Sequence, residues 1–385
     1  MPDDDGLISL SAGLGSGSIL AADVAKGLLA TCIINPTQVE GESYGLAADR
    51  VKLLAKREVL TMARFIGAAL ILFIVTLFTS HGHAGEARPK FPPDEMLAVP
   101  SLTLTDEQFF QGDTANAVAV TMTGQLRFPS WNERLPAVIL LHGTNKSGAV
   151  ARWAEFLNRM GVATFRLDSF GGRGIGEVEI HPSRLSFLAQ FYDTYRAVDV
   201  LAAHPRIDPS RIAVMGFSRG GSAALYTSMR RFQTLHGPSK TRIAAHISFY
   251  PACNIQFVDE LDVADAPIRE FHGAADDTTL PAACRDYVTR LNDGGKDAVM
   301  TEYRGAYHGF DVPDARPGFV GGAQTSRNCQ RREENGKIVN VATAKPFTYT
   351  DACMEPGETR GYDKAATEAA RAAVKKFLTG VFHLN

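Results

Sequence analysis

The sequence predicts an α/β protein built on a doubly wound, mostly parallel sheet flanked by helices. Three observations support this fold class. Apolar runs of strand length alternate with segments of helical spacing from about residue 118 onward, which is the pattern of successive βαβ units. The run Ala137–Gly143 is continuously apolar and ends in glycine, as expected for a strand buried on both faces. A strong helical pattern over Asp363–Gly380 closes the chain.

The elements before residue 206 follow in order. Residues 88–110 contain several prolines and are expected to form a lead-in, and the alternation from Val118 predicts an outer antiparallel strand. Helical spacing with a glycine stop predicts a helix over Ala151–Gly161, and Val162–Asp168 reads as the next strand. A longer helix is expected over Leu185–Pro205, because its apolar residues recur at helical intervals and a proline ends it.

The same alternation continues to the carboxyl end. The stretch RIAVMGFSRGG predicts a strand and a sharp turn, and SAALYTSMRRF predicts a helix. Three more strands are expected to begin in IAAHISFYP, PIREFHGAADD and DAVMTEYRGAYHGF. The stretch Asp311–Gly361 is polar, loop-like and longer than ordinary connections. We therefore expect a single domain over residues 88–385 with a long loop insertion at about 311–361.

The first 87 residues have a different character. The segment Met62–Ala87 begins with methionine and an arginine, continues with the apolar run Phe65–Phe78 and ends in small and polar residues. This order is typical of a secretory signal peptide, and the run is short for a membrane span. We predict a signal peptide at 62–87, export to the periplasm or the medium, and no membrane contact after cleavage. Residues 1–61 are then an upstream extension from a misplaced start, or disordered; a membrane anchor through 65–78 is the alternative.

Composition narrows the function class. The chain has 385 residues, is 45% hydrophobic and 21% charged, and carries a formal net charge of -2. It can therefore bury a sizeable core, and its charge gives no sign of a nucleic-acid partner. The sequence contains neither a Walker-type phosphate loop nor short-range Cys/His pairing of the kind used by structural zinc sites. We expect no cofactor and no metal; the oligomeric state stays open.

Cysteine usage fits export. Cys32 lies in the extension, and the mature part retains Cys253, Cys284, Cys329 and Cys353. An even number of cysteines in an exported chain predicts disulfides, although four cysteines allow three connectivities. We expect Cys253–Cys284, which would join the ends of neighbouring strands, and Cys329–Cys353, which would staple the polar insertion. Four unpaired cysteines are the alternative.

The motif GFSRGG indicates a nucleophile. Ser218 follows a strand and precedes a helix, with Gly216 and Gly220 two residues to either side, and this G-x-S-x-G pattern is typical of a nucleophile elbow. The turn exposes the serine hydroxyl above the sheet and directs the Arg219 amide at the space beside it. The Thr144 amide, after an earlier strand, is the second candidate oxyanion donor.

A serine nucleophile needs a base and an orienting acid, which in this architecture follow later strands in the order acid, then histidine. Asp276 follows one such strand, three residues after Gly273, and His308 follows the last one. We predict the triad Ser218, Asp276, His308. Asp277 is the alternative acid, and Asp276 is also suited to capping the helix that follows.

Candidate substrate-binding residues lie nearby in sequence. Arg173 and Arg219 are suited to an anionic substrate, but Arg219 is also explained by its amide alone, and Arg173 by pairing with an acid such as Asp168. Trp131 and Tyr307 are candidates for lining an acyl or alcohol pocket, and core packing explains them about as well.

These motifs together resemble the α/β-hydrolase superfamily and, within it, the dienelactone hydrolase family. The resemblance covers about Phe109 to Phe382 and is carried by LLHGTNKSG, RLDSFGGRG, GFSRGG, FHGAADDTTLP, YRGAYHGFD and YDKAATEAARAAVKKFL. It implies Ser218 as nucleophile, Asp276 as orienting acid and His308 as general base. Dienelactone hydrolases proper carry cysteine where this chain has Ser218, a difference that alters the leaving groups tolerated. The insertion after His308 is a second departure.

Three functions compete at this point. The first is a secreted serine hydrolase that cleaves carboxylic esters or lactones through an acyl-enzyme. The second is a peptidase of the prolyl-oligopeptidase type, whose elbow also reads G-x-S-x-G-G, although those enzymes usually carry a large amino-terminal propeller. The third is an α/β-hydrolase scaffold kept for binding; such proteins usually lose a triad residue, and this chain retains all three candidates.

Overall fold

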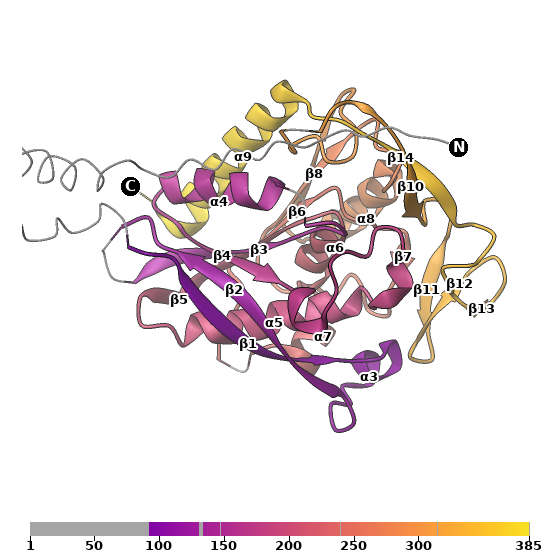
Figure 1. The fold of residues 1–385 in the computed structure, drawn as a ribbon, viewed down its shortest axis with the longest axis horizontal. Helices are drawn as coiled ribbons and strands as arrows, with labels where there is room; N and C mark the ends of the chain where they lie inside the picture. Colours follow the sequence, from indigo (N-terminus) through magenta and orange to yellow (C-terminus); the bar gives the residue numbers. More distant parts are fainter. Residues whose placement is uncertain (1–91, 131–133, 147, 239, 314, 385) are drawn as a thin grey trace, which may run out of the picture. The chain divides into compact units, whose positions relative to one another are not determined.

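The structure is a computed structural model of the chain. It describes residues 92–130, 134–146, 148–238, 240–313 and 315–384 (Figure 1). The predicted extension over 1–61, the predicted signal peptide over 62–87 and Trp131 lie outside the described residues. Within the described ranges, no helix combines the length and the apolar character needed to cross a membrane.

The main sheet has eight strands in the order β1-β2-β4-β3-β5-β6-β8-β9. Strands β4, β3, β5, β6, β8 and β9 pair in parallel, and β1 and β2 add an antiparallel edge. The bounds are β1 (Glu95–Thr103), β2 (Val118–Arg127), β3 (Leu135–Leu141), β4 (Ala163–Asp168), β5 (Ile207–Phe217), β6 (Ala245–Phe249), β8 (Ile268–Gly273) and β9 (Ala298–Tyr303). Chain order reverses at β3, so the carboxyl ends of β3 and β5 frame the expected crevice.

Helices cover both faces of this sheet, which confirms the predicted fold class. Successive residues of β3 alternate between two cores: Ile139 belongs to the core that includes residues of α5, α6 and α8, whereas Val138 and Leu140 belong to the core that includes residues of α4 and α9. Figure 1 shows α4 and α9 on one side of the sheet and α5 on the other. The helix bounds are α3 (Asp106–Gln111), α4 (Ala149–Arg159), α5 (Leu188–Ala202), α6 (Arg219–Tyr226), α7 (Arg230–His236), α8 (Pro281–Asp293) and α9 (Lys364–Phe382), with short 3-10 turns at Gly171–Arg173 and Pro182–Arg184.

Two local expectations were wrong. The proline-rich lead-in over 88–110 contains β1 and α3. A proline is compatible with β1 because β1 is an edge strand, where alternate N–H groups point away from the single neighbouring strand. The single helix expected over SAALYTSMRRF is two helices, because Met229 forms a β-bridge with Val263 between α6 and α7.

The insertion is folded, in contrast to the long loop that its polar composition suggested. It carries β10 (Gly318–Thr325), β11 (Arg331–Glu334), β12 (Lys337–Asn340), β13 (Lys345–Pro346) and β14 (Glu355–Arg360). β10 pairs with β14, while β11, β12 and β13 form a small sheet with β7 (Ile255–Gln256), which follows β6. Strands β11 and β13 are short and polar, so their pattern lacks the apolar alternation by which strands are recognised.

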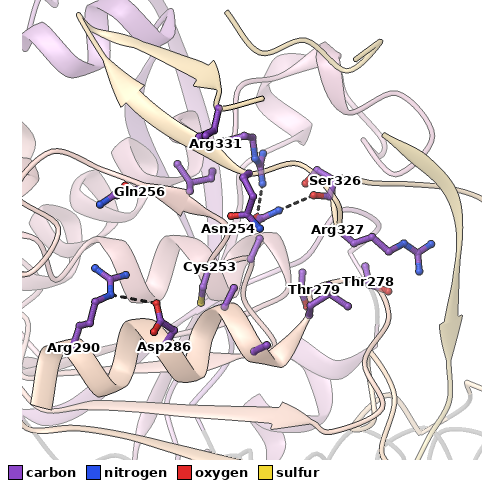
Figure 2. Close-up of a pocket in the computed structure, with 17 residues that line it drawn as sticks. Cys253, Asn254, Gln256, Thr278, Thr279, Asp286, Arg290, Ser326, Arg327 and Arg331 are labelled. Atoms are coloured by element: carbon purple, nitrogen blue, oxygen red, sulfur yellow. Dashed lines mark hydrogen bonds and ion pairs between the residues drawn. The ribbon is translucent and has the colours of Figure 1, made fainter. Parts of the chain in front are cut away.

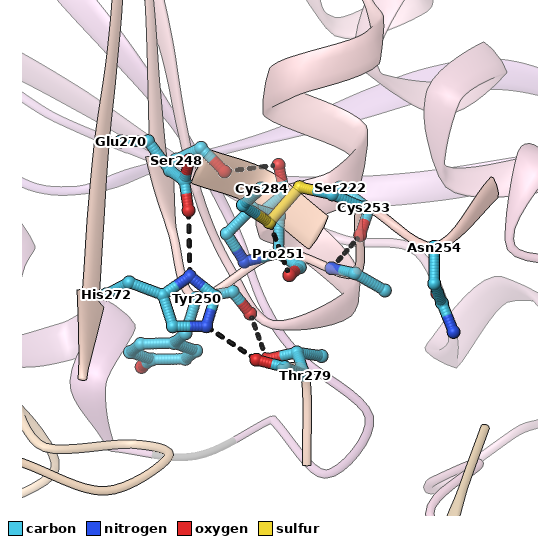
Figure 3. The surroundings of a disulfide bond; sticks show 12 residues. Ser222, Ser248, Tyr250, Pro251, Cys253, Asn254, Glu270, His272, Thr279 and Cys284 are labelled. Carbon is cyan, nitrogen blue, oxygen red and sulfur yellow. Dashed lines mark hydrogen bonds and ion pairs between the residues drawn. A yellow bond between two sulfur atoms is a disulfide. The ribbon is translucent and has the colours of Figure 1, made fainter. Parts of the chain in front are cut away.

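Disulfides join these parts with the predicted pairing. Cys253–Cys284 links the segment after β6 to α8 (Figure 3), and Cys329–Cys353 closes the insertion on itself. The Asn254 side-chain amide donates to the carbonyl oxygens of Ser326 and Cys329, at 2.6 and 2.9 Å. The insertion is therefore anchored to the core beside the first disulfide.

Candidate active site

The turn that carries Ser218 requires small neighbours. Ser218 has φ 54° and ψ -118°, a strained conformation for a residue with a side chain. A Cβ added at Gly216 would lie 1.9 Å from the Gly220 carbonyl oxygen, and one added at Gly220 would lie 2.3 Å from the Leu141 oxygen. The glycines therefore allow β5, α6 and β3 to approach closely, and the strained turn presents the hydroxyl at the carboxyl end of β5.

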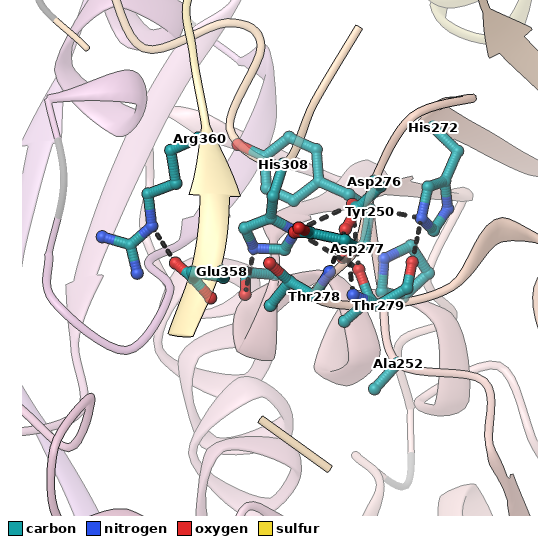
Figure 4. A network of polar contacts seen from close by, with 12 residues as sticks. Tyr250, Ala252, His272, Asp276, Asp277, Thr278, Thr279, His308, Glu358 and Arg360 are labelled. Carbon is teal, nitrogen blue, oxygen red and sulfur yellow. Dashed lines mark hydrogen bonds and ion pairs between the residues drawn. The ribbon is translucent and has the colours of Figure 1, made fainter. Parts of the chain in front are cut away.

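Three strand-end loops bring the predicted triad residues together. Ser218 Oγ lies 2.9 Å from His308 Nε2, and His308 Nδ1 lies 2.8 Å from Asp276 Oδ2. Ser218 follows β5, Asp276 follows β8 and His308 follows β9. Figure 4 shows His308 and Asp276 pointing toward each other, with Thr279 beside them. The serine hydroxyl is thus placed to give its proton to a histidine whose other nitrogen faces a carboxylate.

Electrostatics favour an ionised Asp276 next to a basic His308. Burial alone would raise the pKa of Asp276, but the charge of His308 and hydrogen bonds from His272 and His308 hold it well below its usual value. Burial disfavours the charged form of His308, yet the charge and hydrogen bond of Asp276 raise its pKa above the ordinary value. Asp276 therefore favours the imidazolium that forms when His308 accepts a proton.

The two adjacent aspartates face different partners. Asp276 Oδ1 accepts from the Thr278 and Thr279 amides at 2.8 and 2.9 Å, which leaves Oδ2 for His308. Asp277 instead accepts from the Thr359 amide and hydroxyl, both at 2.7 Å, on β14 of the insertion. The structure thus brings Asp276, and not the alternative acid, to His308.

The loop after β3 approaches Ser218 from the other side. A Cβ added at Gly143 would lie 3.3 Å from Ser218 Cβ, and Thr144 lines the same cavity as Ser218. The amide of Arg219 belongs to the first turn of α6, where N–H groups lack intrahelical partners. His142 fixes the loop: its Nδ1 donates to the Gly143 oxygen at 2.7 Å and its Nε2 accepts from the Ser169 amide at 3.2 Å. Burial lowers the pKa of His142 to about 4, so this neutral tautomer persists.

A buried aspartate that the sequence reasoning missed anchors the loop of His308. Asp311 accepts from Trp153 Nε1 and from the Tyr250 hydroxyl, both at 2.6 Å, and is fully buried. Burial raises the pKa of its carboxyl. The sequence signal for this role was the place of Asp311 shortly after His308. A charged residue near a site histidine needs hydrogen-bond partners if it is buried.

The cavity beside Ser218 and His308 is small, about 130 Å³, and much of its wall comes from the insertion. The insertion contributes Ala323, Gln324, Thr325, Ser326, Arg331, Tyr349, Glu358 and Arg360. A second cavity of about 680 Å³ lies next to it between α8 and the insertion (Figure 2). Thr279, Ser326 and Arg331 line both cavities, so the two adjoin.

Two buried arginines line the small cavity without a carboxylate partner among the described residues. Arg219 Nη2 donates to the carbonyl oxygens of Leu185 and Ser186, at 2.9 and 2.6 Å, and Arg331 Nη2 donates to Asn254 Oδ1 at 2.6 Å. The Nε atoms of both arginines find no acceptor among the described residues. Burial lowers the pKa of each guanidinium to about 10, so both stay charged at neutral pH. Arg331 was not a candidate from sequence because its segment read as loop.

The remaining candidates lie elsewhere. Arg173 is bound to Asp193 through Nη1 at 2.7 Å and to Thr103 through Nε at 2.9 Å, so it pairs with an acid other than Asp168 and does not line the cavity. Tyr307 is half-buried and is not part of the cavity wall either. Among the described residues, Cys253, Glu270 and Cys284 are grouped closely enough for a metal, but both sulfur atoms are in a disulfide.

One protein family and several solved structures are similar to this chain. Residues 186–382 match the dienelactone hydrolase family. Similar solved structures include the dienelactone hydrolase-like promiscuous phosphotriesterase P91 from metagenomic libraries, with 15% identity, a TM-score of 0.49, and coverage of 74% of this chain and 98% of that one. Est1E from Butyrivibrio proteoclasticus has 15% identity and a TM-score of 0.42, with 69% and 96% covered. Esterase 2 from Thermogutta terrifontis has 18% identity and a TM-score of 0.42, with 58% and 88% covered.

No curated protein matches the chain in sequence. The family match spans the strand and turn of Ser218, the loops of Asp276 and His308, the insertion and the closing helix. It confirms the resemblance inferred from the motifs and the prediction of a hydrolase that acts on ester bonds. The chain belongs to the dienelactone hydrolase family of α/β-hydrolases.

Proposed function

We propose that the protein is an exported serine hydrolase that cleaves carboxylic esters or lactones through an acyl-enzyme. The observation that carries the proposal is the hydrogen-bonded line from Ser218 through His308 to Asp276, with distances of 2.9 and 2.8 Å. A serine hydroxyl becomes an effective nucleophile when such a line removes its proton as it attacks.

The steps follow from the geometry. Ser218 Oγ attacks the ester carbonyl carbon while His308 Nε2 accepts the hydroxyl proton. The amides of Arg219 and Thr144 donate to the oxyanion of the tetrahedral intermediate. His308 then gives its proton to the leaving alkoxide, and the C–O bond of the ester breaks. In the second half, His308 takes a proton from water, the hydroxide adds to the acyl-enzyme, and collapse returns the proton to Ser218 and releases the acid.

Two disulfides support the proposed export, because such bonds form and persist in oxidising compartments. In this proposal, residues 62–87 direct the chain across the membrane and are removed. Intact-mass measurement of the protein from the producing cell tests this point: a mature chain that still carries residues before Met62 contradicts it.

Labelling with a fluorophosphonate tests the chemistry directly. We expect one covalent adduct, located by peptide mass spectrometry on Ser218, and faster turnover of p-nitrophenyl esters and lactones than of matched peptide amides. Preferred cleavage of amides would favour a prolyl-oligopeptidase-type acyl peptidase instead. If folded protein with both disulfides formed neither reacts with the fluorophosphonate nor hydrolyses any of these substrates, a binding scaffold is favoured and the proposal is overturned.

Arg219 and Arg331 support a preference for substrates with a carboxylate near the scissile ester. Both guanidiniums are buried in the wall of the small cavity and form no direct ion pair with an acid among the described residues. The cavity acids Glu179 and Glu358 already pair with Arg360. A buried, uncompensated cation is unfavourable until an anion approaches it, so an anionic acyl group is the complementary ligand.

The variant Arg331→Gln is expected to raise KM for an anionic ester roughly tenfold or more and to leave kcat/KM for a neutral ester within about threefold. The comparison uses p-nitrophenyl hemisuccinate and p-nitrophenyl butyrate, which share a leaving group. Arg332→Gln is the matched control, because the neighbouring Arg332 pairs with Glu334 on the exposed side of β11. Equal losses on both esters in R331Q would contradict the charge-based preference.

A further inference from the structure

The series of hydrogen-bonded side chains from Ser218 through His308 to Asp276 continues beyond Asp276. His272 Nε2 lies 3.3 Å from Asp276 Oδ2, and His272 Nδ1 lies 2.7 Å from Glu270 Oε1. Both side chains are fully buried on β8. Figure 4 shows His272 on the side of Asp276 away from His308, and Figure 3 shows Glu270 at the far end, beside the Cys253–Cys284 disulfide. Five side chains therefore run from the nucleophile into the core.

The backbone fixes one proton of His272. The Thr279 carbonyl oxygen lies 2.6 Å from His272 Nε2. A carbonyl only accepts, so Nε2 carries hydrogen and presents it to Thr279 and to Asp276. Nδ1 faces the Glu270 carboxylate, which favours a second proton there. Burial opposes the imidazolium, but hydrogen bonds and charges of Asp276 and Glu270 outweigh it and raise the pKa of His272 to about 10.

These contacts leave the carboxylate of Asp276 no freedom to rotate. Oδ1 accepts from the amides of Thr278 and Thr279. Oδ2 accepts from His308 and, at 3.1 Å, from the Thr279 hydroxyl, with the His272 N–H at 3.3 Å. An imidazolium of His272 beside an ionised Glu270 carries no net charge as a pair, and the pair presents its positive end to Asp276.

We propose that His272, held by Glu270, is a positioning residue that fixes Asp276 and offsets part of its negative charge at His308. The inference rests on the proposed function. An Asp276 charge without this offset would hold a proton on His308 more tightly, so that less of the histidine would be free to act as base. The His272–Glu270 pair thereby keeps the base available at lower pH while leaving the acid ionised.

Other charged and titratable groups face the two histidines from neighbouring elements. Those facing His308 are Glu358 and Arg360 of β14, Asp311 after β9 and Tyr250 after β6, and the one facing His272 is Glu302 of β9. Glu358 pairs with Arg360, and Glu302 pairs with Arg285. The groups that face His308 are therefore common to the wild type and the variant. Glu302 loses the favourable charge of His272 in the variant but keeps its ion pair with Arg285.

The test is the pH dependence of kcat/KM in His272→Gln, which retains an N–H donor and loses the charge. Activity rises with pH as His308 loses its proton. Removal of the neighbouring positive charge makes His308 easier to protonate, so the acid limb of the profile moves to higher pH. We compare the ratio of wild-type to variant kcat/KM at two pH values. One pH unit below the wild-type midpoint, this ratio should be roughly three- to tenfold larger than on the high-pH plateau.

His246→Gln is the matched control. His246 is also fully buried, on β6, and bonds the Ala224 oxygen at 2.8 Å without contacting Asp276. We expect a lower melting temperature and an unmoved acid limb in that variant. A uniform loss of kcat/KM at all pH values in H272Q, with the limb in place, would reduce His272 to a packing role and overturn the inference.

A second measurement does not depend on the variant folding. In wild-type protein labelled with ¹⁵N at histidine, NMR should show protons on both ring nitrogens of His272 throughout the pH range in which His308 titrates. In the Glu270→Gln variant, His272 should lose its second proton at a lower pH than in the wild type. A singly protonated His272 ring at pH 7 would overturn the inference. Absence of fluorophosphonate labelling in the wild type would instead overturn the proposed function, so the two failures are distinguishable.

Discussion

Replacement of Ser218 by alanine is expected to abolish fluorophosphonate labelling and to lower kcat/KM for p-nitrophenyl esters by about 10⁴- to 10⁶-fold. The reason is that His308 then has no hydroxyl to deprotonate, and the remaining amides and pocket can only bind the substrate. Melting temperature should change little, because the serine turn is held by the flanking glycines and by the amide of residue 218, which donates to the Phe249 oxygen at 2.9 Å.

Ser228→Ala is the control for this prediction. Ser228 is a buried serine just beyond α6 whose hydroxyl donates to the Leu225 oxygen at 2.6 Å, and it does not line the cavity. The Ser228→Ala variant should react with the fluorophosphonate and hydrolyse p-nitrophenyl esters like the wild type. Retention of more than about a hundredth of the wild-type kcat/KM in S218A, with purity verified by mass, would mean that another group attacks the ester.

The second large effect concerns the two adjacent aspartates. Asp276→Asn should lower kcat by roughly 10³- to 10⁴-fold. An amide in this place must turn an N–H either toward the amides of Thr278 and Thr279 or toward the N–H of His308, so at least one donor faces another donor. The imidazolium that forms on His308 also loses its counter-charge.

Asp277→Asn provides the matched comparison, since its carboxylate faces Thr359 and lies 3.7 Å from the Arg327 guanidinium. We expect kcat within about tenfold of the wild type, and a lower melting temperature because the insertion loses an anchor. Steady-state kinetics and thermal unfolding of both variants decide the point. A larger loss in D277N than in D276N would transfer the role of orienting acid to Asp277.

The core of the fold was readable from sequence because the physics there is local. A parallel strand between two helical layers must be apolar on both faces, and the run Ala137–Leu141 shows this without ambiguity. The elbow and its partners were readable for a similar reason, because each follows a recognisable strand end. The order of strands then brings residues 90 positions apart, Ser218 and His308, within hydrogen-bonding distance.

What the sequence did not reveal depends on partners distant in the chain. Strands of the insertion are polar and short, and β11 acquires its place by pairing with β7, some 75 residues earlier. Arg331 therefore gave no sign that it lines a cavity. For Arg173, pairing with an acid was one of the two expectations, but the acid is Asp193 on α5 and not Asp168, and sequence spacing does not show which acid lies nearby. His272 gave no sign of a role, because nothing in one sequence shows that the Glu270 carboxylate lies 2.7 Å from its Nδ1.

The division of the cavity wall has a consequence for laboratory evolution. The side chains of Ser218, His308 and Asp276 follow strand ends of the main sheet. Eight residues of the cavity wall come instead from the insertion, which is closed by its own disulfide. Libraries restricted to the insertion, with Glu358 and Arg360 kept because they face His308, would therefore explore substrate scope with little change to the chemical step. Exchange of this segment between relatives becomes a modular operation if its contacts with Asp277, Asn254 and strand β7 are preserved.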